Sequence, residues 1–384
     1  MKHLINPLVK ETQISGIRQF ATYVSKFDNV LSLTIGQPDY PTPPSVKESG
    51  KSAIDHNKTI YTPNAGLPEL CKAACEFVAD RYHLTYDPAS EVIVTMGASE
   101  AIDISFRTIL EEGCEVILPA PVYPGYEPII RLCGATPVYV DTRETNFTLT
   151  KEALEAAITE KTRCVVLPYP SNPIGVTLSK ETLDDIIDVL KDKDIFVVSD
   201  EIYSELVYGE EHQSIATHPV MHEKTIVING LSKSHSMTGW RIGFAFAPSY
   251  LAQEMLKVHQ YNVSCATSIS QYAAVEALTN ARDTPKEMKK SYEERRDFVY
   301  KRFLEMGLDV PKPTGAFYLF PSISKFGLSS FDFATKLVEE ERVAVIPGSA
   351  FSSYGEGHIR ISYAYSYDTL VEACDRLERF IKTL

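Results

Sequence analysis

The chain has 384 residues, of which 44% are hydrophobic and 23% are charged, a composition typical of a soluble enzyme. This length is sufficient for two or three domains with a large buried core. The 38 Lys and Arg against 51 Asp and Glu give a net charge of −13. Because no dense basic run accompanies this charge, the sequence argues against binding to nucleic acid or to an anionic membrane.

The start of the chain and its cysteines favour a cytoplasmic location. Residues 1–7 lack the apolar stretch of a signal peptide, and no stretch reaches the roughly 20 apolar residues of a membrane span. Seven cysteines with scattered spacing are typical of reduced thiols rather than of a disulfide framework. Cys71 and Cys75 would share one helix face, but no second pair of ligands accompanies them. We therefore expect them to be packing residues and expect no metal site.

Residues 1–45 contain Pro38, Pro41, Pro43 and Pro44 but no strand series and no long helical pattern, which predicts an extended arm. From about residue 90 to 250, short Val- and Ile-rich runs alternate with amphipathic stretches. Runs that are apolar on both faces are typical of a mostly parallel sheet covered by helices. The runs are Glu91–Thr95, Glu115–Pro119, Pro137–Val140, Cys164–Pro168, Ile195–Asp200, Thr225–Asn229 and Gly243–Ala247, and Lys180–Lys191 is an example of the amphipathic covers.

The last hundred residues have a different character. A long charged helix is predicted around Lys286–Met306, followed by short strands and a final helix from Asp368 to about Thr383. This order is typical of a smaller α+β domain. The predicted fold class is therefore α/β, with a large domain at 46–280 and a small domain at 281–384. Residues 1–45 would be the arm and a part of the small domain.

Polar residues follow several of the predicted strands, at the edge where open parallel sheets bind ligands. Ala98 and Ser99 follow Gly97 at a helix start, where free backbone N–H groups favour a phosphate. Tyr123 follows the next strand and could stack on an aromatic ring. Asn172 lies in a proline-rich loop after a third strand. Each of these has an ordinary structural explanation when taken alone.

Two further strand ends carry the residues with the clearest chemistry. Asp200 directly follows a buried strand, and a buried carboxylate needs a partner, either the next helix start or a protonated pyridine nitrogen. Lys233 follows the next strand, and Arg241 comes eight residues later. A lysine amine can form a Schiff base with an aldehyde, and an arginine fork can hold a phosphate. Together the strand ends indicate a cofactor that is both aldehyde and phosphate, as pyridoxal phosphate (PLP) is.

Over its whole length, from Ile35–Asp39 to Arg360, the chain resembles the fold-type I, class I/II PLP-dependent aminotransferases. The segments that carry the resemblance are Tyr61–Gly66, Gly97–Ser99, Tyr123-Pro124, Ser171–Gly175, Ser199–Tyr203, Ser232-Lys233, Gly239–Arg241 and Arg360. Within the family, the sequences of the segments Ser171–Ser179 and Asn229–Gly243 look most like those of bacterial N-acetyl-L,L-diaminopimelate aminotransferases of lysine and cell-wall biosynthesis.

The resemblance implies a role for each matched residue. Lys233 would be the catalytic residue that carries the cofactor and then moves the substrate proton. Arg360 would bind the substrate α-carboxylate, with Asn172 and the backbone at Gly36. The expected cofactor-binding residues are Ala98 and Ser99 (phosphate, through N–H groups), Tyr123 (ring stacking), Asn172 and Tyr203 (phenolic oxygen), Asp200 (pyridine nitrogen), Ser232 and Arg241 (phosphate) and, from the neighbouring subunit of a homodimer, Tyr61 (phosphate).

Two positions depart from the family pattern, and the substrate side chain is the least defined part of the prediction. Gly230 replaces a hydroxyl residue that many relatives use for the phosphate, and Ile174 replaces a threonine in the substrate loop. We expect the substrate side chain to be recognised by the arm near Ile14–Arg18 and by a pocket wall near Tyr261-Asn262. Arg18 would face a distal carboxylate.

The predicted activity is transfer of an amino group between an amino acid and a 2-oxo acid, with glutamate and 2-oxoglutarate as one pair. Specificity for N-acetyl-L,L-diaminopimelate, for aspartate and for aromatic donors all stay open at this point. A β-lyase, a decarboxylase or an aminocyclopropane-carboxylate synthase would use the same cofactor residues. A non-catalytic PLP-sensing regulator would need an added DNA-binding domain, and a nicotinamide dehydrogenase would need a Gly-x-Gly-x-x-Gly turn.

Overall fold

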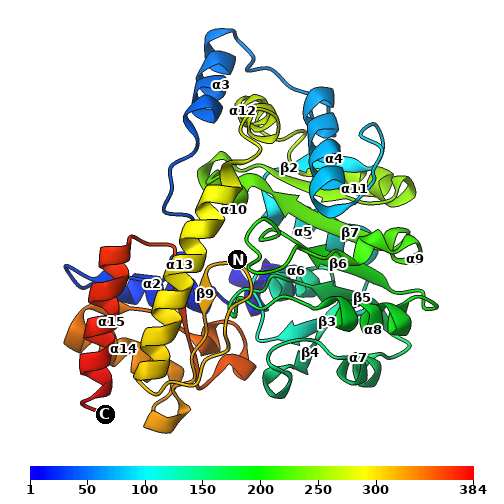
Figure 1. Cartoon of the computed structure of the whole chain (residues 1–384). Coiled ribbons are helices and arrows are strands. Elements are labelled where there is room, and N and C mark those ends of the chain that lie inside the picture. The colour runs from blue at the N-terminus through cyan, green and yellow to red at the C-terminus, as the bar shows by residue number, and fades with distance from the viewer.

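The computed structural model describes residues 1–384. A seven-stranded sheet with helices on both faces lies beside a smaller group of helices and short strands (Figure 1). This arrangement confirms the predicted α/β class. None of the helices is long and apolar enough to cross a lipid bilayer.

The sheet has the strand order β2-β8-β7-β6-β5-β3-β4. Only β8 runs antiparallel to its neighbours, so the sheet is mostly parallel, as expected. Each strand falls on one of the apolar runs of the sequence. Their bounds are β2 Val92–Thr95, β3 Glu115–Ala120, β4 Thr136–Asp141, β5 Thr162–Leu167, β6 Phe196–Asp200, β7 Thr225–Gly230 and β8 Gly243–Phe246.

Successive strand residues point to opposite faces, and each face has its own helical cover. In β5, Cys164 and Val166 belong to the core that packs under α5, α6 and α11, whereas Val165 and Leu167 belong to the core under α7 and α8. The other helices of this region are α3, α4, α9, α10 and α12. The bounds are α3 Pro44–Asp55, α4 Pro68–Tyr82, α5 Ala98–Ile109, α6 Tyr126–Leu132, α7 Lys151–Ala157, α8 Lys180–Leu190, α9 Pro219–His222, α10 Leu231–Ser234, α11 Ser249–Asn262 and α12 Ser268–Leu278.

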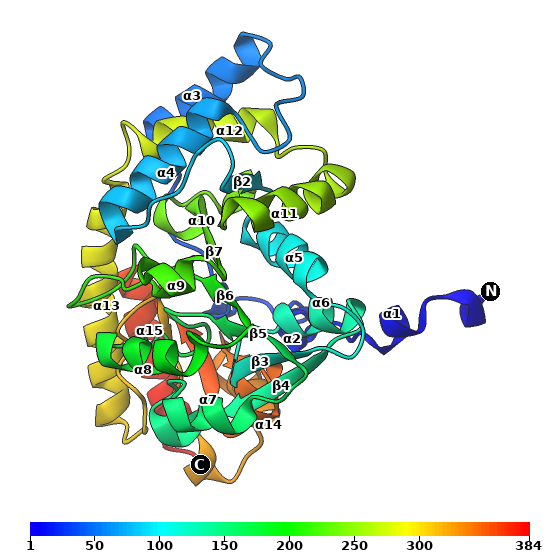
Figure 2. The ribbon, with the colours of Figure 1, turned by 90° about the vertical axis from the view of Figure 1, so that its right-hand side faces the viewer.

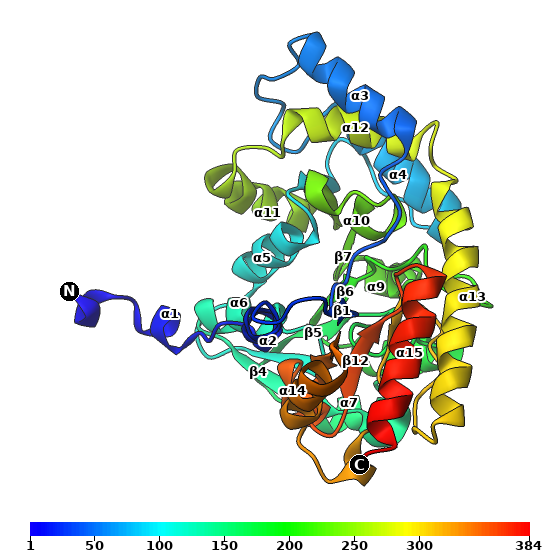
Figure 3. The ribbon, with the colours of Figure 1, turned by 90° about the vertical axis from the view of Figure 1, so that its left-hand side faces the viewer.

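The smaller group contains the C-terminal third and part of the N-terminal segment. The long helix α13 and the final helix α15 lie side by side, with α14 and α2 (Gly16–Val24) next to them (Figure 3). A three-stranded antiparallel sheet has the order β11-β12-β9. The bounds are α13 Thr284–Glu305, β9 Tyr318–Leu319, α14 Ser330–Glu341, β10 Val343–Ala344, β11 Ile346–Pro347, β12 Ile359–Ser362 and α15 Tyr367–Ile381.

The N-terminal segment is more structured than the sequence predicted. It contains α1 (Pro7–Glu11), α2 (Gly16–Val24) and β1 (Leu31–Ser32), which pairs in parallel with β10. The helical pattern of α2 was missed because it is short, although Phe20 of this helix is fully buried. The first residues and α1 project away from the body (Figure 2). We propose domain boundaries near residues 45 and 280, with the N-terminal segment belonging partly to the small domain.

Candidate active site at the carboxyl ends of the strands

A cavity of about 470 Å³ opens at the carboxyl ends of the parallel strands, between the large sheet and the N-terminal and C-terminal segments. Eleven of the twelve predicted site residues line it. The lining residues among them are Gly36, Ala98, Ser99, Tyr123, Asn172, Asp200, Tyr203, Ser232, Lys233, Arg241 and Arg360. Tyr61 is the exception, because it lies outside the cavity with 85% of its surface exposed.

Lys233 faces the cavity from the short helix α10, directly after β7. Its Nζ donates a hydrogen bond to the carbonyl oxygen of Gly36 at 2.6 Å. Enclosure by protein, together with the charges of Arg360 and Arg241, lowers the pKa of Lys233 to about 8. A much larger fraction of this amine is therefore neutral near pH 7 than for an ordinary lysine, as a nucleophile or a general base requires.

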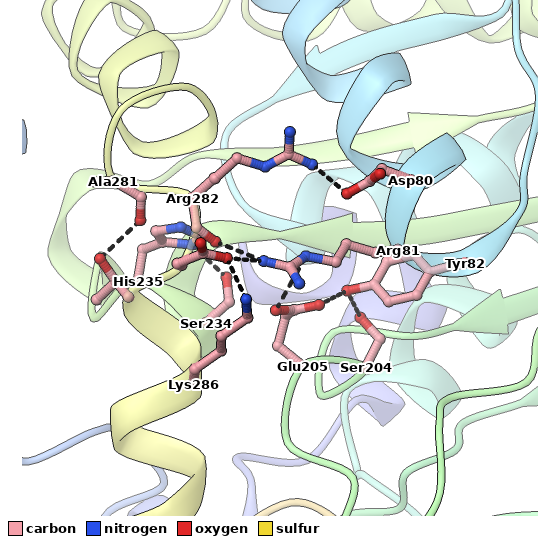
Figure 4. Close-up of polar contacts among 12 residues, drawn as sticks. Asp80, Arg81, Tyr82, Ser204, Glu205, Ser234, His235, Ala281, Arg282 and Lys286 are labelled. Atoms are coloured by element: carbon pink, nitrogen blue, oxygen red, sulfur yellow. Dashed lines mark hydrogen bonds and ion pairs between the residues drawn. The ribbon is translucent and has the colours of Figure 1, made fainter.

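A chain of buried polar groups fixes the strand end before Lys233. Asn229 accepts the Gly230 N–H at 2.8 Å and donates to the Ser204 hydroxyl at 3.0 Å. That hydroxyl donates to the Tyr82 hydroxyl at 2.8 Å, which donates to Glu205 at 2.6 Å. Figure 4 shows this contact beside Arg81 of α4. The end of β7 is thereby tied to the large-domain helix α4.

The same cluster continues to the start of α13. Arg81 pairs with Asp283 at 2.6 Å, and Lys286 pairs with the same carboxylate at 2.9 Å. Arg282 pairs with Asp80 at 2.6 Å (Figure 4). These ion pairs join α4 to the junction between α12 and α13, so the lysine-bearing loop and the start of the C-terminal segment share one polar framework.

Asp200 ends β6 as a buried carboxylate, 6% exposed. The hydroxyl of Tyr126 donates to its Oδ2 at 2.6 Å, and the Ile202 N–H donates to Oδ1 at 3.3 Å. Burial raises the pKa of Asp200, and the hydrogen bond from Tyr126 opposes that rise. Sequence reasoning missed Tyr126, although its position three residues after Tyr123 and at a helix start was visible.

The turn between β2 and α5 lies beside Arg241. Gly97 adopts φ +78°, and a Cβ at this position would come within 2.5 Å of the Arg241 Nη2. The guanidinium donates to the carbonyl oxygens of Thr238 at 3.0 Å and Met96 at 3.2 Å. The first N–H groups of a helix have no partner within the helix. Together with the guanidinium they form a site for an anion.

Arg360 of β12 is a buried cation, 3% exposed, that forms no ion pair within the chain. Its Nη1 donates to Asn172 at 3.0 Å and its Nη2 donates to the Thr34 carbonyl oxygen, but its buried Nε has no hydrogen-bond partner. A buried charge without a counter-ion is costly. A carboxylate that binds in the cavity would accept from the free Nε–H group and would supply the missing counter-ion.

Tyr318 is a second lining residue that the sequence did not single out, because it lies in β9, one of the short strands of the C-terminal third. Its hydroxyl lies 2.7 Å from the Tyr203 hydroxyl, and its ring lies 4.6 Å from the Arg360 guanidinium. A Cβ at Gly36 would collide with the Tyr318 hydroxyl. The tyrosine therefore explains why the segment opposite Lys233 carries a glycine.

Several residues considered for the substrate side do not line the cavity of this chain. Tyr261 is 87% exposed at the end of α11, Asn262 donates to Asp103 on α5, and neither lines the cavity. Ile174 is 1% exposed within the hydrophobic core and does not line it either. From the arm, Ile17 and Ala21 of α2 line the cavity, whereas Arg18 lies just outside it.

Gly230 is explained by packing. It ends β7 outside the cavity lining, and a Cβ there would lie 3.0 Å from both the Gly243 Cα and the Ile242 carbonyl oxygen. A larger residue would need the neighbouring backbone to shift. The anion site beside Arg241 is therefore formed without a hydroxyl from this position.

Residues 28–377 match the family model described as aminotransferase class I and II. The chain belongs to this family. The aminotransferase is 59% identical to a probable N-acetyl-LL-diaminopimelate aminotransferase of Bacillus subtilis, over 99% of this chain and 96% of that one. It is 42% identical to an aspartate aminotransferase of Pyrococcus abyssi, over 99% and 97% of the two chains.

Solved structures agree with this assignment. The aminotransferase superposes on the aspartate aminotransferase of Thermus thermophilus with maleate at a TM-score of 0.93, with 34% identity over 98% of this chain and 99% of that one. The aromatic aminotransferase of Pyrococcus horikoshii gives a TM-score of 0.90, with 42% identity over 95% and 99%. The resemblance expected from the motifs is confirmed, and the protein is a PLP-dependent aminotransferase.

Proposed function

We propose that the cavity at the strand ends is the active site and that Lys233 carries the cofactor in it. The proposal is supported most directly by the half-buried amine of Lys233, whose pKa is lowered to about 8 by its enclosure. The donor set around it also fits PLP: an isolated buried carboxylate, a guanidinium at a helix start and an aromatic ring. When bound, PLP supplies an electron-accepting ring that stabilises negative charge at the substrate Cα.

In this proposal the residues around Lys233 have separate tasks. Asp200 would accept a hydrogen bond from the pyridine N–H and so hold that proton in place, while the hydrogen bond from Tyr126 favours the ionised carboxylate against the effect of burial. Tyr123 covers one face of the ring. Asn172 and Tyr203 donate to the phenolic oxygen. The amine of Lys233 would hold the cofactor and, when free, would accept and return the proton of the substrate Cα as general base and general acid.

The two anions are bound at opposite ends of the cavity. The Ala98 and Ser99 N–H groups, the Ser232 hydroxyl and the Arg241 guanidinium bind the phosphate. Arg360 binds the substrate α-carboxylate through its guanidinium, with help from Asn172 and the backbone at Gly36. This division uses both arginines that line the cavity.

The active form is proposed to be a homodimer. Tyr61 lies outside its own cavity with 85% of its surface exposed, and Ile60 beside it is 78% exposed. Exposed apolar side chains of this kind are typical of a surface that a second copy covers. In the dimer Tyr61 would reach the phosphate in the neighbouring subunit.

The proposed amino donor is N-acetyl-LL-diaminopimelate, with glutamate and 2-oxoglutarate as the other pair, which places the enzyme in lysine biosynthesis. The 59% identity over the full chain supports this choice. The cavity also supports it, since Ile17 and Ala21 offer an apolar wall for the methylene groups of a long donor. Arg18, just beyond that wall, suits a distant carboxylate better than the short side chain of aspartate.

A donor panel tests the substrate. N-acetyl-LL-diaminopimelate, aspartate, alanine and aromatic amino acids are assayed with 2-oxoglutarate, and kcat/KM is compared. The proposal expects N-acetyl-LL-diaminopimelate to exceed the other donors, and a preference for aromatic donors or for aspartate would overturn it. Release of pyruvate and ammonia without an acceptor would indicate a β-lyase.

A further inference from the structure

A fully buried imidazole lies behind the anion site, outside the cavity. His259 of α11 has no exposed surface, and α11 runs beside α5 (Figure 2). Its Nδ1 lies 2.8 Å from Glu100 Oε1, and its Nε2 lies 2.9 Å from the backbone carbonyl oxygen of Asn64. Both ring nitrogens therefore face oxygen atoms.

The hydrogen-bonding capacity of these atoms determines how many protons they hold. A carbonyl oxygen can only accept, so Nε2 must donate to Asn64. In a neutral ring Nδ1 would then be an acceptor that faces a carboxylate, and two acceptors repel each other. A second proton must lie between Nδ1 and Glu100. His259 and Glu100 together therefore hold one proton more than a neutral imidazole beside an ionised carboxylate would hold. Their contact is a charge-assisted hydrogen bond.

One end of this group meets the anion site. The side chain of Glu100 is 9% exposed, and its Oε2 accepts the Met96 N–H at 2.5 Å. The carbonyl oxygen of Met96 accepts the Arg241 Nη2 at 3.2 Å. Met96 is the residue before Gly97, so Glu100 fixes the turn that presents the first N–H groups of α5.

The other end meets the loop 61–66, which carries Tyr61. Asn64 donates through its side chain to the Ser264 carbonyl oxygen at 2.6 Å, just beyond α11. Gln271 of α12 donates to the Thr62 hydroxyl at 2.9 Å. The loop is thus attached to α11 and α12, and His259 alone connects it to the Glu100 side chain.

The charged groups around the imidazole leave Glu100 as its only ionic partner. Asp103, one turn along α5, pairs with Arg107 and accepts from Asn262. The loop 61–66 offers its backbone, and α12 offers the neutral Gln271. The proton between His259 and Glu100 is therefore held by these two groups.

We propose that His259 is a positioning residue for the cofactor phosphate: it donates from both ring nitrogens and clamps the Met96–Ser99 turn to the Tyr61 loop. The inference rests on the proposed phosphate site. In a dimer the same clamp would link the phosphate site of one subunit to the loop that serves the other. It takes no part in the chemical step.

The test uses the full-length protein and two variants whose hydrogen bonds differ in a defined way. In Glu100→Gln, the amide oxygen accepts from Met96 and the amide nitrogen donates to Nδ1, so a neutral ring still satisfies Asn64. In His259→Gln, both N–H donors belong to one atom, whereas the imidazole donates from two separate ring nitrogens, so we expect the amide to keep only one of the two partners. Glu254→Gln, on the exposed face of α11, is the control, because Glu254 pairs only with Lys257.

The first readout is the dissociation constant of PLP at neutral pH. We expect His259→Gln to raise it about 10-fold or more, the size of one lost charge-assisted hydrogen bond, and Glu100→Gln and Glu254→Gln to change it less than about 3-fold. Unchanged PLP affinity in His259→Gln would overturn the proposal. So would an equally weakened Glu100→Gln, because the clamp geometry is intact in that variant.

The second readout is independent of cofactor and activity. The ¹⁵N spectrum of histidine-labelled protein should show both His259 nitrogens protonated in the wild type and only Nε2 protonated in Glu100→Gln. If His259→Gln does not fold, the His259 signals are assigned instead as the histidine ¹⁵N signals that shift in Glu100→Gln. A wild-type ring with a single proton would overturn the clamp. Failure of PLP to attach at Lys233 would instead refute the proposed active site, whatever the state of the ring.

Discussion

The two walls of the cavity are built in different ways. The cofactor wall consists of residues at the ends of buried strands, among them Asp200 and Lys233, and polar side chains behind them are paired. The substrate wall comes from α2, the segment at Gly36 and β11, where Ile17, Ala21 and Ile346 line the cavity. Helix α2 has one fully buried residue, Phe20.

The difference suggests that the cofactor wall carries the catalytic groups and that the substrate wall determines the choice of amino donor. Relatives described as aspartate, aromatic and N-acetyl-LL-diaminopimelate aminotransferases are all at least 41% identical to this chain over nearly its whole length. A sheet edge held by a packed core keeps catalytic groups in place, whereas a short surface helix can change residues at little cost in stability. We infer that donor choice is determined mainly at the substrate wall.

The largest effect should come from removing the amine at the cofactor wall. Lys233→Ala should lower kcat on the order of 10⁴-fold, because the variant loses both the nucleophile and the proton carrier. Steady-state transamination with 2-oxoglutarate measures this loss. Lys257→Ala, an exposed lysine of α11, is the control and should keep full activity. Near-normal turnover of Lys233→Ala would refute the site.

The lowered pKa of Lys233 predicts a pH dependence of cofactor attachment. The neutral amine attacks the aldehyde, and its fraction grows as pH rises through the pKa of about 8. The rate of PLP attachment to the apoenzyme should therefore increase up to about pH 8 and level off above it. An ordinary lysine would continue to gain rate toward pH 10.5. Arg360→Met removes one positive charge and should move the plateau to higher pH.

Substitution of Arg360 tests whether this residue binds the α-carboxylate that all amino donors share or instead contacts the donor side chain. Arg360→Ala should lower kcat/KM for every amino donor by roughly 10- to 150-fold, the size of a lost charge-assisted pair of 1.5–3 kcal/mol. Arg360→Lys should recover little of this loss, because a lysine has the charge but not the fork. Equal losses across the donor panel are expected. A loss confined to one donor would mean that Arg360 reads the side chain instead.

Tyr126 should have a smaller effect that depends on pH. Tyr126→Phe removes the donor that opposes the burial of Asp200, so the pKa of Asp200 rises further. Since the ionised carboxylate is the active form, the acid limb of the pH–rate profile should move to higher pH. At neutral pH we expect a decrease in kcat of about 10-fold. An unchanged acid limb would show that Tyr126 does not act on Asp200.

Arg18 should give the smallest and most selective effect. Arg18→Ala should lower kcat/KM several-fold for donors with a distal carboxylate, in the range of an exposed ion pair of about 1 kcal/mol or less. It should leave alanine and the PLP affinity unchanged. Comparison of kcat/KM for N-acetyl-LL-diaminopimelate and alanine measures the effect. An equal decrease in kcat/KM for both donors would indicate that Arg18 supports the fold and does not recognise the distal carboxylate.

The cofactor wall could be predicted from the sequence because its residues follow strands that the apolar runs reveal. Asp200 is an example: a carboxylate at the end of Phe196–Asp200 must lie at the sheet edge. What the sequence could not show are contacts between distant segments. Tyr126 meets Asp200 across 74 positions and Tyr318 meets Tyr203 across 115, and neither sits in a distinctive motif.

The substrate wall was harder to predict for a different reason. Helix α2 is short, and its burial depends on tertiary packing, so its pattern carries little signal. Tyr261 and Asn262 lie at the end of α11 and do not line the cavity of their own chain, so the prediction of a pocket wall there stays a prediction. His259, two residues earlier, is buried, which no property of the sequence indicated.

Peptide mapping after borohydride reduction tests the assignment of the cofactor wall most directly. Reduction fixes PLP to the lysine that carries it, and mass spectrometry of a digest then identifies that residue. We expect PLP on the peptide that contains Lys233, in an amount of one per chain, and none on this peptide in Lys233→Ala. Stoichiometric modification of a different lysine in the wild type would contradict the assignment.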